Sequence, residues 1–254
     1  MDGAVPFDLG AIRAKPLAAA HAHVHDRIVE LAMAYGMPNI EVSASNALGR
    51  VCVPAQIDPP TLCLGLPLVQ DERADVRDFL IHRALKVLQT RTAAFARTAP
   101  IDLWPLMAAY LKIHSPSFEP AGADPGKVND FYAKISAVAP RMLDPHTNLL
   151  ASEVISTIAN RASSLATLAN AWGSRTALLA LGDPYLAIEA IGWASGSSQD
   201  APPDGRDRLR WIGRQAEGRD LIVFTVSDQY VALREHLGVA AAGLVDDIDV
   251  DLDS

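Results

Sequence analysis

Residues 71–90, DERADVRDFLIHRALKVLQT, constrain most strongly what this chain can fold into. At 100° per residue their apolar side chains fall in two adjacent rows, so most of the perimeter of a helix here requires burial. The two rows are Val76, Leu80, Ala84 and Val87, and Ile81, Leu85 and Leu88. The sequence therefore predicts a central helix against which the rest of the chain packs.

The polar residues of this helix form one narrow stripe, made up of Asp75, Asp78, His82, Lys86 and Gln89. His82 and Lys86 are four residues apart and face the same way. A zinc-binding His-Glu-x-x-His helix uses this spacing to direct two imidazoles at one metal ion. Here Arg83 stands at the glutamate position and Lys86 at the second histidine position, so only the first ligand is present.

Composition limits the classes of function. The chain has 254 residues, half of them hydrophobic, and can bury a sizeable core as one large domain or two small ones. Its 30 acidic and 22 basic residues give a net charge of −8, which argues against a general binder of nucleic acid or anionic membranes. Because neither a signal-type segment nor an apolar run of about 20 residues occurs, we expect a soluble, cytoplasmic protein. Cys52 and Cys63 are too few for a disulfide framework and are expected to be buried thiols.

Residues 1–15 lack periodicity and are expected to be a lead-in to a helix over residues 16–37. That helix carries His21, His23 and His25. On a strand, alternating histidines would suggest metal ligands, but on a helix only His21 and His25 share a face. A solvated helix face is the simpler interpretation, and a metal site that combines His21 and His25 with His82 stays open as the alternative.

Three short strands are predicted between this helix and the central one. Apolar residues alternate with polar ones around residues 40–44, 51–55 and 62–66. Turn-forming residues separate the strands, at residues 46–49 (NALG) and 58–60 (DPP). The sequence thus predicts an α/β (α+β), mostly helical fold, with a small three-stranded antiparallel sheet packed on the central helix.

Helical spacing returns after the central helix, over residues 102–113, 128–138, 148–172, 176–191, 208–217 and 227–237. Residues 114–127, rich in Pro, Gly and Ser, are the best internal linker. They divide the chain into a sheet and central-helix half, 16–113, and a helical half of the same domain, 128–240. Residues 241–254 form an acidic tail, interpreted as disordered and solubilising or, alternatively, as a peptide that adds to a partner's sheet edge.

The order of these features resembles the minigluzincin fold, the core of zinc metallopeptidases that include the CaaX prenyl protease and the heat-shock membrane peptidase. The matching features are the Asn46-Ala47 turn, a strand that ends Gly65-Leu66, an acidic segment before the central helix, and His82 at the start of its motif. In that family the turn reads Asn-Ala-Phe, the strand ends Gly-Leu-Leu and the helix carries His-Glu-x-x-His. The resemblance implies a similar core in which the metal motif has been lost.

A later segment extends this resemblance. The family places its third zinc ligand in a Glu-x-x-Ala-Asp-Arg motif shortly before a Gly-Asp-Pro-like break. Here residues 170–175 read NAWGSR and residues 182–184 read GDP. Asn170 stands at the position of the ligand glutamate and Ser174 at that of the aspartate, while Arg175 is retained. Because an amide is a weak, uncharged zinc ligand, the resemblance implies a second loss at the metal site.

The C-terminal half also resembles, more loosely, a domain at the end of large bacterial tetratricopeptide-repeat proteins. There a segment similar to residues 221–238 (LIVFTVSDQYVALREHLG) follows a degenerate peptidase-like core. No such repeats occur in this sequence. This second resemblance implies an excised C-terminal domain of that type.

Together these observations predict a pseudopeptidase without catalytic residues, metal or cofactor, which binds a protein or peptide in the old cleft or through its sheet edge. We hypothesise that the Lys86 ammonium occupies the place of the metal charge, held by Asn170 or by Asp75 and Asp78; a plain solvated helix face is the alternative. A zinc-dependent hydrolase with relocated ligands and a purely structural assembly domain also stay open. The vestigial site is expected at His82, Arg83, Lys86, Asn170, Ser174 and Arg175.

Overall fold

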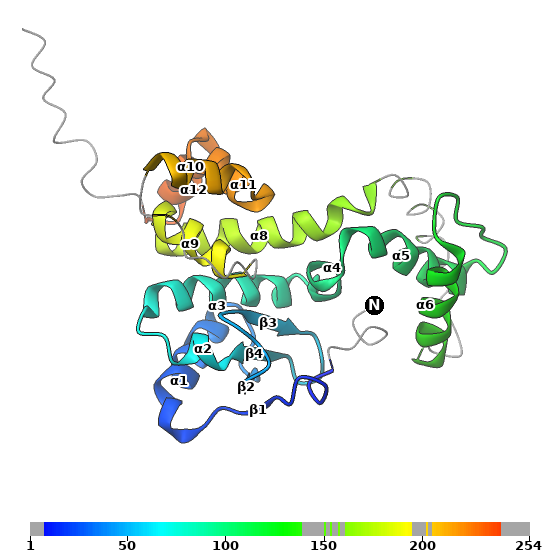
Figure 1. The fold of residues 1–254 in the computed structure, drawn as a ribbon, viewed down its shortest axis with the longest axis horizontal. Helices are drawn as coiled ribbons and strands as arrows, with labels where there is room; N and C mark the ends of the chain where they lie inside the picture. The colour runs from blue at the N-terminus through cyan, green and yellow to red at the C-terminus, as the bar shows by residue number, and fades with distance from the viewer. Residues whose placement is uncertain are drawn as a thin grey trace, which may run out of the picture.

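Helix α3 (Ala74–Gln89) runs through the middle of the molecule, between the sheet and the later helices (Figure 1). The computed structural model describes residues 8–138, 150, 153, 157, 161–194, 202 and 205–239. Phe79, Ile81 and Leu85 of α3 are completely buried, and both of its predicted apolar rows lie in the main hydrophobic core. The prediction of a central helix is therefore confirmed, as is that of a mostly helical fold with a small sheet.

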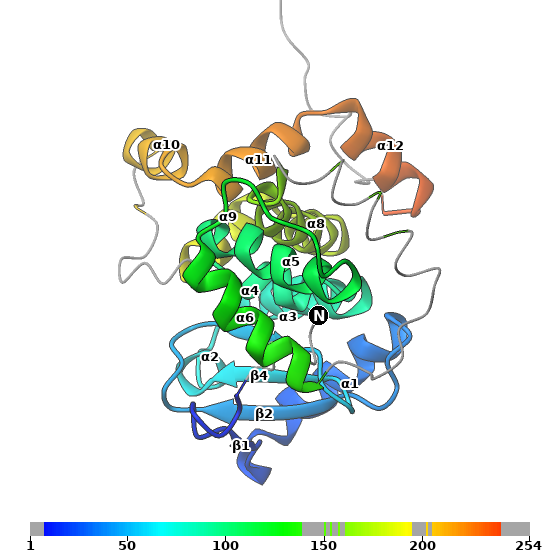
Figure 2. The same ribbon diagram turned by 90° about the vertical axis from the view of Figure 1, so that its right-hand side faces the viewer.

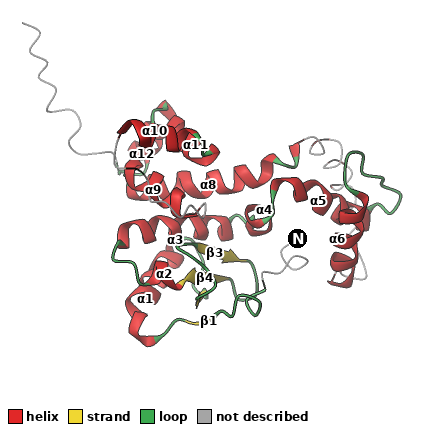
Figure 3. Cartoon of the chain, viewed as in Figure 1, coloured by secondary structure: helices red, strands yellow, loops and turns green. Residues whose placement is uncertain are grey.

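The sheet has four strands, in the spatial order β1-β2-β4-β3 (Figure 1); strands are yellow in Figure 3. The strands are β1 (Lys15–Pro16), β2 (Glu41–Ser45), β3 (Cys52–Ala55) and β4 (Thr61–Gly65). β4 pairs parallel to β2 and antiparallel to β3, and β1 pairs antiparallel to β2.

The predicted three-stranded antiparallel meander is therefore wrong in strand number and in order. β2 and β3 are neighbours in sequence, but β4 lies between them. All five residues of β4 are buried, and a strand covered on both faces and both edges favours such a near-continuous apolar run. The alternation of side chains locates strands in the sequence but carries no information on which of them is central.

The N-terminal helical segment is shorter than predicted. It consists of a 3₁₀ turn, Ala19–His21, and helix α1 (Ala22–Ala34). The lead-in was predicted to end at residue 15 and the helix to begin at residue 16. Both boundaries are wrong, because Lys15 and Pro16 pair with Ala44 and Ser43 of β2 instead. A short helix α2 (Leu66–Val69) follows β4 and leads into α3.

Helices α4 (Ala93–Arg97), α5 (Pro100–His114) and α6 (Pro125–Val138) extend away from the end of α3 (Figure 1), so that α5 and α6 lie in front in the view of Figure 2. The predicted linker, residues 114–127, contains the connection between α5 and α6. These two helices pack against each other around a small hydrophobic cluster of their own, made up of Leu106, Ala108, Ala109, Val128 and Ile135.

The remaining described helices lie across α3 from the sheet (Figure 1). They are α8 (Ser164–Leu181), α9 (Pro184–Ala194), α10 (Gly205–Gly213), α11 (Ala216–Thr225) and α12 (Asp228–His236). The predicted cap of the last helix is confirmed, because the Ser227 side chain accepts a hydrogen bond from the Tyr230 amide. None of the described helices is long and apolar enough to cross a membrane. The predicted tail, residues 241–254, lies outside the described residues.

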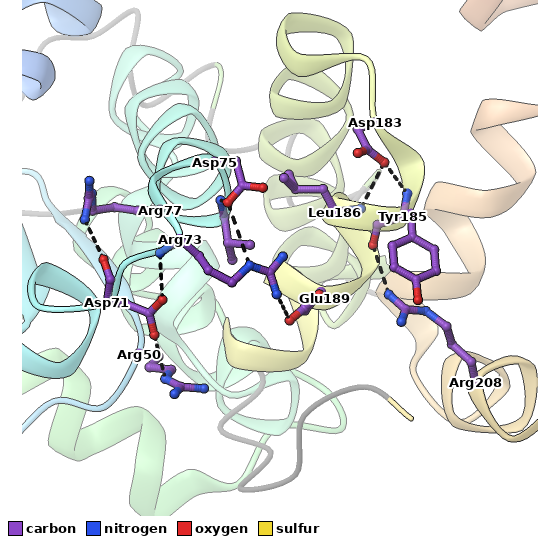
Figure 4. Close-up of polar contacts among 11 residues, drawn as sticks. Arg50, Asp71, Arg73, Asp75, Arg77, Asp183, Tyr185, Leu186, Glu189 and Arg208 are labelled. Carbon is purple, nitrogen blue, oxygen red and sulfur yellow. Dashed lines mark hydrogen bonds and ion pairs between the residues drawn. The ribbon is translucent and has the colours of Figure 1, made fainter. Parts of the chain in front are cut away.

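The break between α8 and α9 falls at Gly182, at the Gly-Asp-Pro segment that the resemblance indicated. Gly173, which separates the two helical stretches predicted from periodicity, lies inside α8. Gly182 adopts a positive φ of 75°, which favours glycine after a helix end. The Asp183 carboxylate then accepts hydrogen bonds from the amides of Tyr185 and Leu186, at 2.8 and 3.1 Å, and so caps α9 (Figure 4).

Ion pairs connect α9 to the start of α3 (Figure 4). Arg73 contacts Glu189 of α9, and Asp71 accepts from the Arg73 amide and pairs with Arg50 at 3.3 Å. The guanidinium groups of Arg50 and Arg73 lie 4.6 and 5.8 Å from the ring centre of the buried Trp193. These contacts hold α9 beside α3. Ala194, at the end of α9, therefore lies at the margin of a cleft next to β3.

Candidate functional site

Helices α3 and α8 are in close contact at Gly173. A Cβ atom added to Gly173 would lie 2.8 Å from the carbonyl oxygen of Arg83 and 2.9 Å from its Cγ. Only glycine allows this approach without displacing the α3 backbone. The close contact brings Asn170 and Ser174, on the same side of α8, to the Arg83 side chain.

The Arg83 guanidinium joins three helices. Its Nη2 donates to Asn170 Oδ1 at 2.7 Å, and its Nε donates to Ser174 Oγ at 3.1 Å. Nε and Nη2 also donate to the two carboxylate oxygens of Glu217, in the first turn of α11, at 3.0 and 3.2 Å. The Ser174 hydroxyl donates to the same Glu217 carboxylate. The Arg83 and Glu217 side chains are only 14% and 23% exposed, so this is a largely desolvated ion pair.

The amide of Asn170 is fixed from its other side. Its Nδ2 donates to the carbonyl oxygens of Ala96 and Ala166, at 3.2 and 3.1 Å. Asn170 Oδ1 therefore points at Arg83 and its NH₂ group points at the backbone of α4 and α8. We call the set Arg83, Asn170, Ser174 and Glu217 the Arg83 network.

Three members of the Arg83 network, Arg83, Asn170 and Glu217, line a cleft of about 340 Å³. β3 also lines this cleft. Helices α3, α4 and the end of α9 complete it with Ala84, Val87, Ala96, Arg97 and Ala194. The cleft therefore combines an edge strand, a partly apolar lining and two cations: Arg83, which is paired with Glu217, and Arg97, which donates to the Pro54 carbonyl.

The pairing of β3 determines which backbone groups point away from the sheet. The Gly65 amide donates to the Val51 carbonyl at 2.9 Å, so Val51 and Val53 bond to β4 and the backbone groups of Cys52 and Pro54 point outward. Proline has no N–H, and the Pro54 carbonyl accepts a hydrogen bond from Arg97 Nη1 at 2.6 Å. The amide and carbonyl of Cys52 are the outward-pointing pair that an added strand could use.

The residues of the predicted vestigial site do not all lie together. Arg83, Asn170 and Ser174 come together, but His82 lies on another side of α3, where its Nδ1 is 2.9 Å from the Tyr35 hydroxyl. Burial lowers the pKa of His82, an effect that the nearby Asp78 carboxylate opposes. Burial also raises the pKa of Tyr35 to about 12. At neutral pH a neutral imidazole thus packs against a neutral phenol.

The hypothesis that Lys86 takes the place of a metal charge is wrong. Lys86 Nζ donates to Gln89 at 2.8 Å, while Asn170 bonds to Arg83 and Asp78 to Arg27. The physical reason is helical geometry: His82 and Arg83 are adjacent, so they point about 100° apart. The polar stripe faces α1, and the next position along the helix faces α8.

Arg175, the remaining vestigial position, has a structural role. Its Nε and Nη2 donate to the Asp220 carboxylate at 3.0 and 2.6 Å, and its guanidinium lies 4.9 Å from the ring centre of Phe224. Both partners belong to α11. Arg175 is therefore one of the contacts that hold α11 on α8.

The alternative metal ligands are not assembled in this fold. His25 contacts its neighbour Asp26, His82 contacts Tyr35, and His21 lines a different cavity. Among the described residues there is no group of three or more His, Cys, Asp or Glu side chains placed to hold one metal ion. Cys52 and Cys63 are buried free thiols, as predicted, and burial raises the pKa of both, which disfavours a nucleophilic thiolate.

Glu217 is the member of the Arg83 network that the sequence did not reveal. It lies 134 residues after Arg83, at what was predicted to be the end of a helix over residues 208–217. In the structure α10 ends at Gly213, and Glu217 lies in the first turn of α11, which begins at Ala216. The one local signal is that acidic residues are common in the first turn of a helix, and Glu217 lies two residues after Gln215, where the helical pattern restarts.

Comparisons of this chain with protein-family models, curated proteins and solved structures found no significant match. The resemblance to the minigluzincin core thus stays a prediction from the motifs quoted above.

Proposed function

We propose that this chain is a non-catalytic interaction domain of the pseudopeptidase kind, which binds an extended protein or peptide segment in the cleft beside β3. One observation carries the proposal. The cleft lies beside an outward-pointing strand edge, while its polar side is occupied by the Arg83–Glu217 ion pair. A peptide can add to a strand edge by backbone hydrogen bonds alone, and this requires neither metal nor nucleophile.

The hydrogen bonds that the Glu217 carboxylate accepts support a non-catalytic function. Glu217 is the one carboxylate among the described residues that line the cleft. Its oxygens already accept hydrogen bonds from Arg83 and from the Ser174 hydroxyl. To accept a proton from a water molecule as a general base, it would have to give up this pairing in a largely desolvated place.

The features of β3 define the expected ligand. Cys52 supplies one outward amide and one carbonyl, and the Pro54 carbonyl is already taken by Arg97. The strand pairing is thus short, and the apolar cleft lining has to supply most of the remaining contact. We infer a ligand with one extended residue opposite Cys52, flanked by small or apolar side chains. Free Cys52 and Cys63 accord with the reducing cytoplasm, which we propose as the compartment.

A display selection of linear peptides on the purified protein tests this function. Selected peptides are expected to lose affinity about tenfold or more when the cleft is filled by Ala96→Leu, and to keep it with the matched control Ala133→Leu on the exposed side of α6. Methylation of single peptide amides should abolish binding at one position and not at its neighbours, since β pairing alternates. Peptides insensitive to both changes would contradict the proposal, and failure to select any peptide would favour a structural assembly domain.

Metal content separates the proposal from the zinc hydrolase alternative. Protein purified without chelator is expected to contain no stoichiometric zinc by inductively coupled plasma mass spectrometry. About one zinc per chain, lost in His82→Ala, would overturn the proposal and require a rearranged site around that imidazole.

A further inference from the structure

A second and larger cavity, of about 840 Å³, lies beside β1, at the opposite edge of the sheet from β3. The turn before β1, the 3₁₀ turn, the end of β2 and the start of α2 surround it. These lining residues are distinct from those of the cleft beside β3. Its size falls within the usual range of small-molecule sites, about 300–1,000 Å³.

The charge of this cavity is of one sign. Arg13, Lys15 and His21 line it, and no aspartate or glutamate is among the described lining residues. Within the described part of the chain, the side chains of Arg13 and Lys15 form no ion pair or hydrogen bond. In a protein of net charge −8, two unpaired cations at the same cavity create a local site for an anion.

The turn that carries Arg13 is held firmly against the sheet. Arg13 has a positive φ of 52°, and its amide donates to Gly10 while the Ala14 amide donates to Leu9, both at 2.9 Å. The Ser45 hydroxyl at the end of β2 donates to the Ile12 carbonyl. A non-glycine residue persists in this conformation only when its surroundings determine it. The guanidinium is therefore attached to a fixed backbone rather than to a free loop.

The rest of the lining is apolar with a few neutral polar groups. Ile12, Leu17 and Leu66 provide an apolar surface, and Asn46 and Gln70 provide amides. We propose that this cavity binds a small organic anion in which a carboxylate or phosphate group is attached to an apolar body. Arg13 and Lys15 bind the anionic group, and the apolar side chains bind the body.

Calorimetric titration of the full chain with octanoate and octyl phosphate tests the site. Both probes are expected to bind the wild type, and the tighter of the two identifies the preferred anionic group. Arg13→Gln/Lys15→Gln should weaken binding about tenfold or more. The matched control Arg91→Gln/Lys134→Gln removes the same charge from exposed positions, one of which also has a positive φ, and should leave affinity unchanged. Octylammonium, which has the same apolar body and the opposite charge, should not compete.

A second readout does not depend on the variants. Octanoate added to ¹⁵N-labelled protein should shift the amide resonances of residues 44–47, which line the cavity, and leave those of β3 in place. The proposal is wrong if neither probe binds, if the double variant binds as tightly as the control, or if octylammonium competes equally well. Because the peptide cleft is a separate site, these outcomes are independent of the peptide-binding proposal.

Discussion

At the scale of single residues, the guanidinium of Arg83 links α3, α8 and α11 through four hydrogen bonds. Replacement by methionine keeps the side-chain length and leaves the Glu217 carboxylate without its cation. Breaking a buried ion pair costs about 3–5 kcal/mol, so this partly exposed pair is expected to cost about 2–3 kcal/mol of unfolding free energy. Urea denaturation of Arg83→Met measures the loss.

A matched control is Arg175→Met, which breaks the pair with Asp220. Both of those side chains are about one third exposed, and exposed pairs contribute at most about 1 kcal/mol. Adding Glu217→Gln to Arg83→Met should recover part of the lost stability, because the unpaired charge is then removed. Equal losses in the two arginine variants would show that the Arg83 network is not a special source of stability.

His82 gives a prediction about pH. Because burial lowers its pKa in the folded state, the unfolded chain binds the proton first as the pH falls below about 6.5. The stability contributed by His82 is fully present above that pH and decreases as the pH falls toward the lower folded-state pKa. Denaturation curves measured between about pH 5 and 8 should therefore show a shallower pH dependence in His82→Gln than in the wild type. His25→Gln, at a half-exposed histidine of α1, is the matched substitution for comparison.

The residues of the site were only partly predictable. Asn170 and Ser174 were recognised because their motif retains its spacing, and Arg83 because it replaces a glutamate in another motif. The sequence could not show that Arg83 rather than His82 faces α8, since the orientation of a helix buried on most sides depends on its neighbours. Glu217 could not be assigned at all, because a contact across 134 residues leaves no local pattern.

At the scale of elements, the crossing of α3 and α8 depends on Gly173. Gly173→Ala would place a Cβ 2.8 Å from a backbone oxygen of α3, so the helices must separate. Overpacking of this kind costs about 1–3 kcal/mol, and it should also lengthen the bonds of the Arg83 network. Thermal or urea denaturation checks the stability. Gly213→Ala, at a helical glycine with open space around it, should be neutral or stabilising by up to about 1 kcal/mol, and a similar result at Gly173 would contradict the close crossing.

Elements themselves were easier to predict than their arrangement. Periodicity identified α3, α5 and the three longer strands because each has its own hydrophobic pattern. The pairing of β2 with β4 was missed because it is a property of two segments, and β1 was missed because two residues are too few to form a pattern. Gly173 was read as a helix end because a glycine that breaks a helix and one that permits a close crossing have the same local sequence signature.

At the scale of the whole molecule, α5 and α6 pack around a cluster separate from the main core. Local opening requires less free energy where few buried contacts hold a segment. Native-state hydrogen exchange is therefore expected to be faster in residues 125–138 of α6 than in residues 74–89 of α3. The α5–α6 pair would then open without unfolding the sheet or the peptide cleft.

Two core variants make this test specific. Ile135→Ala removes a buried side chain from the small cluster, where such a truncation costs about 2–5 kcal/mol, and should accelerate exchange in α5 and α6 only. Leu85→Ala removes a completely buried side chain from the main core and should accelerate exchange throughout the described helices and strands. If Ile135→Ala accelerates exchange in α3 as much as in α6, the two clusters unfold together, and ligand binding at the sheet would then stabilise α6 as well.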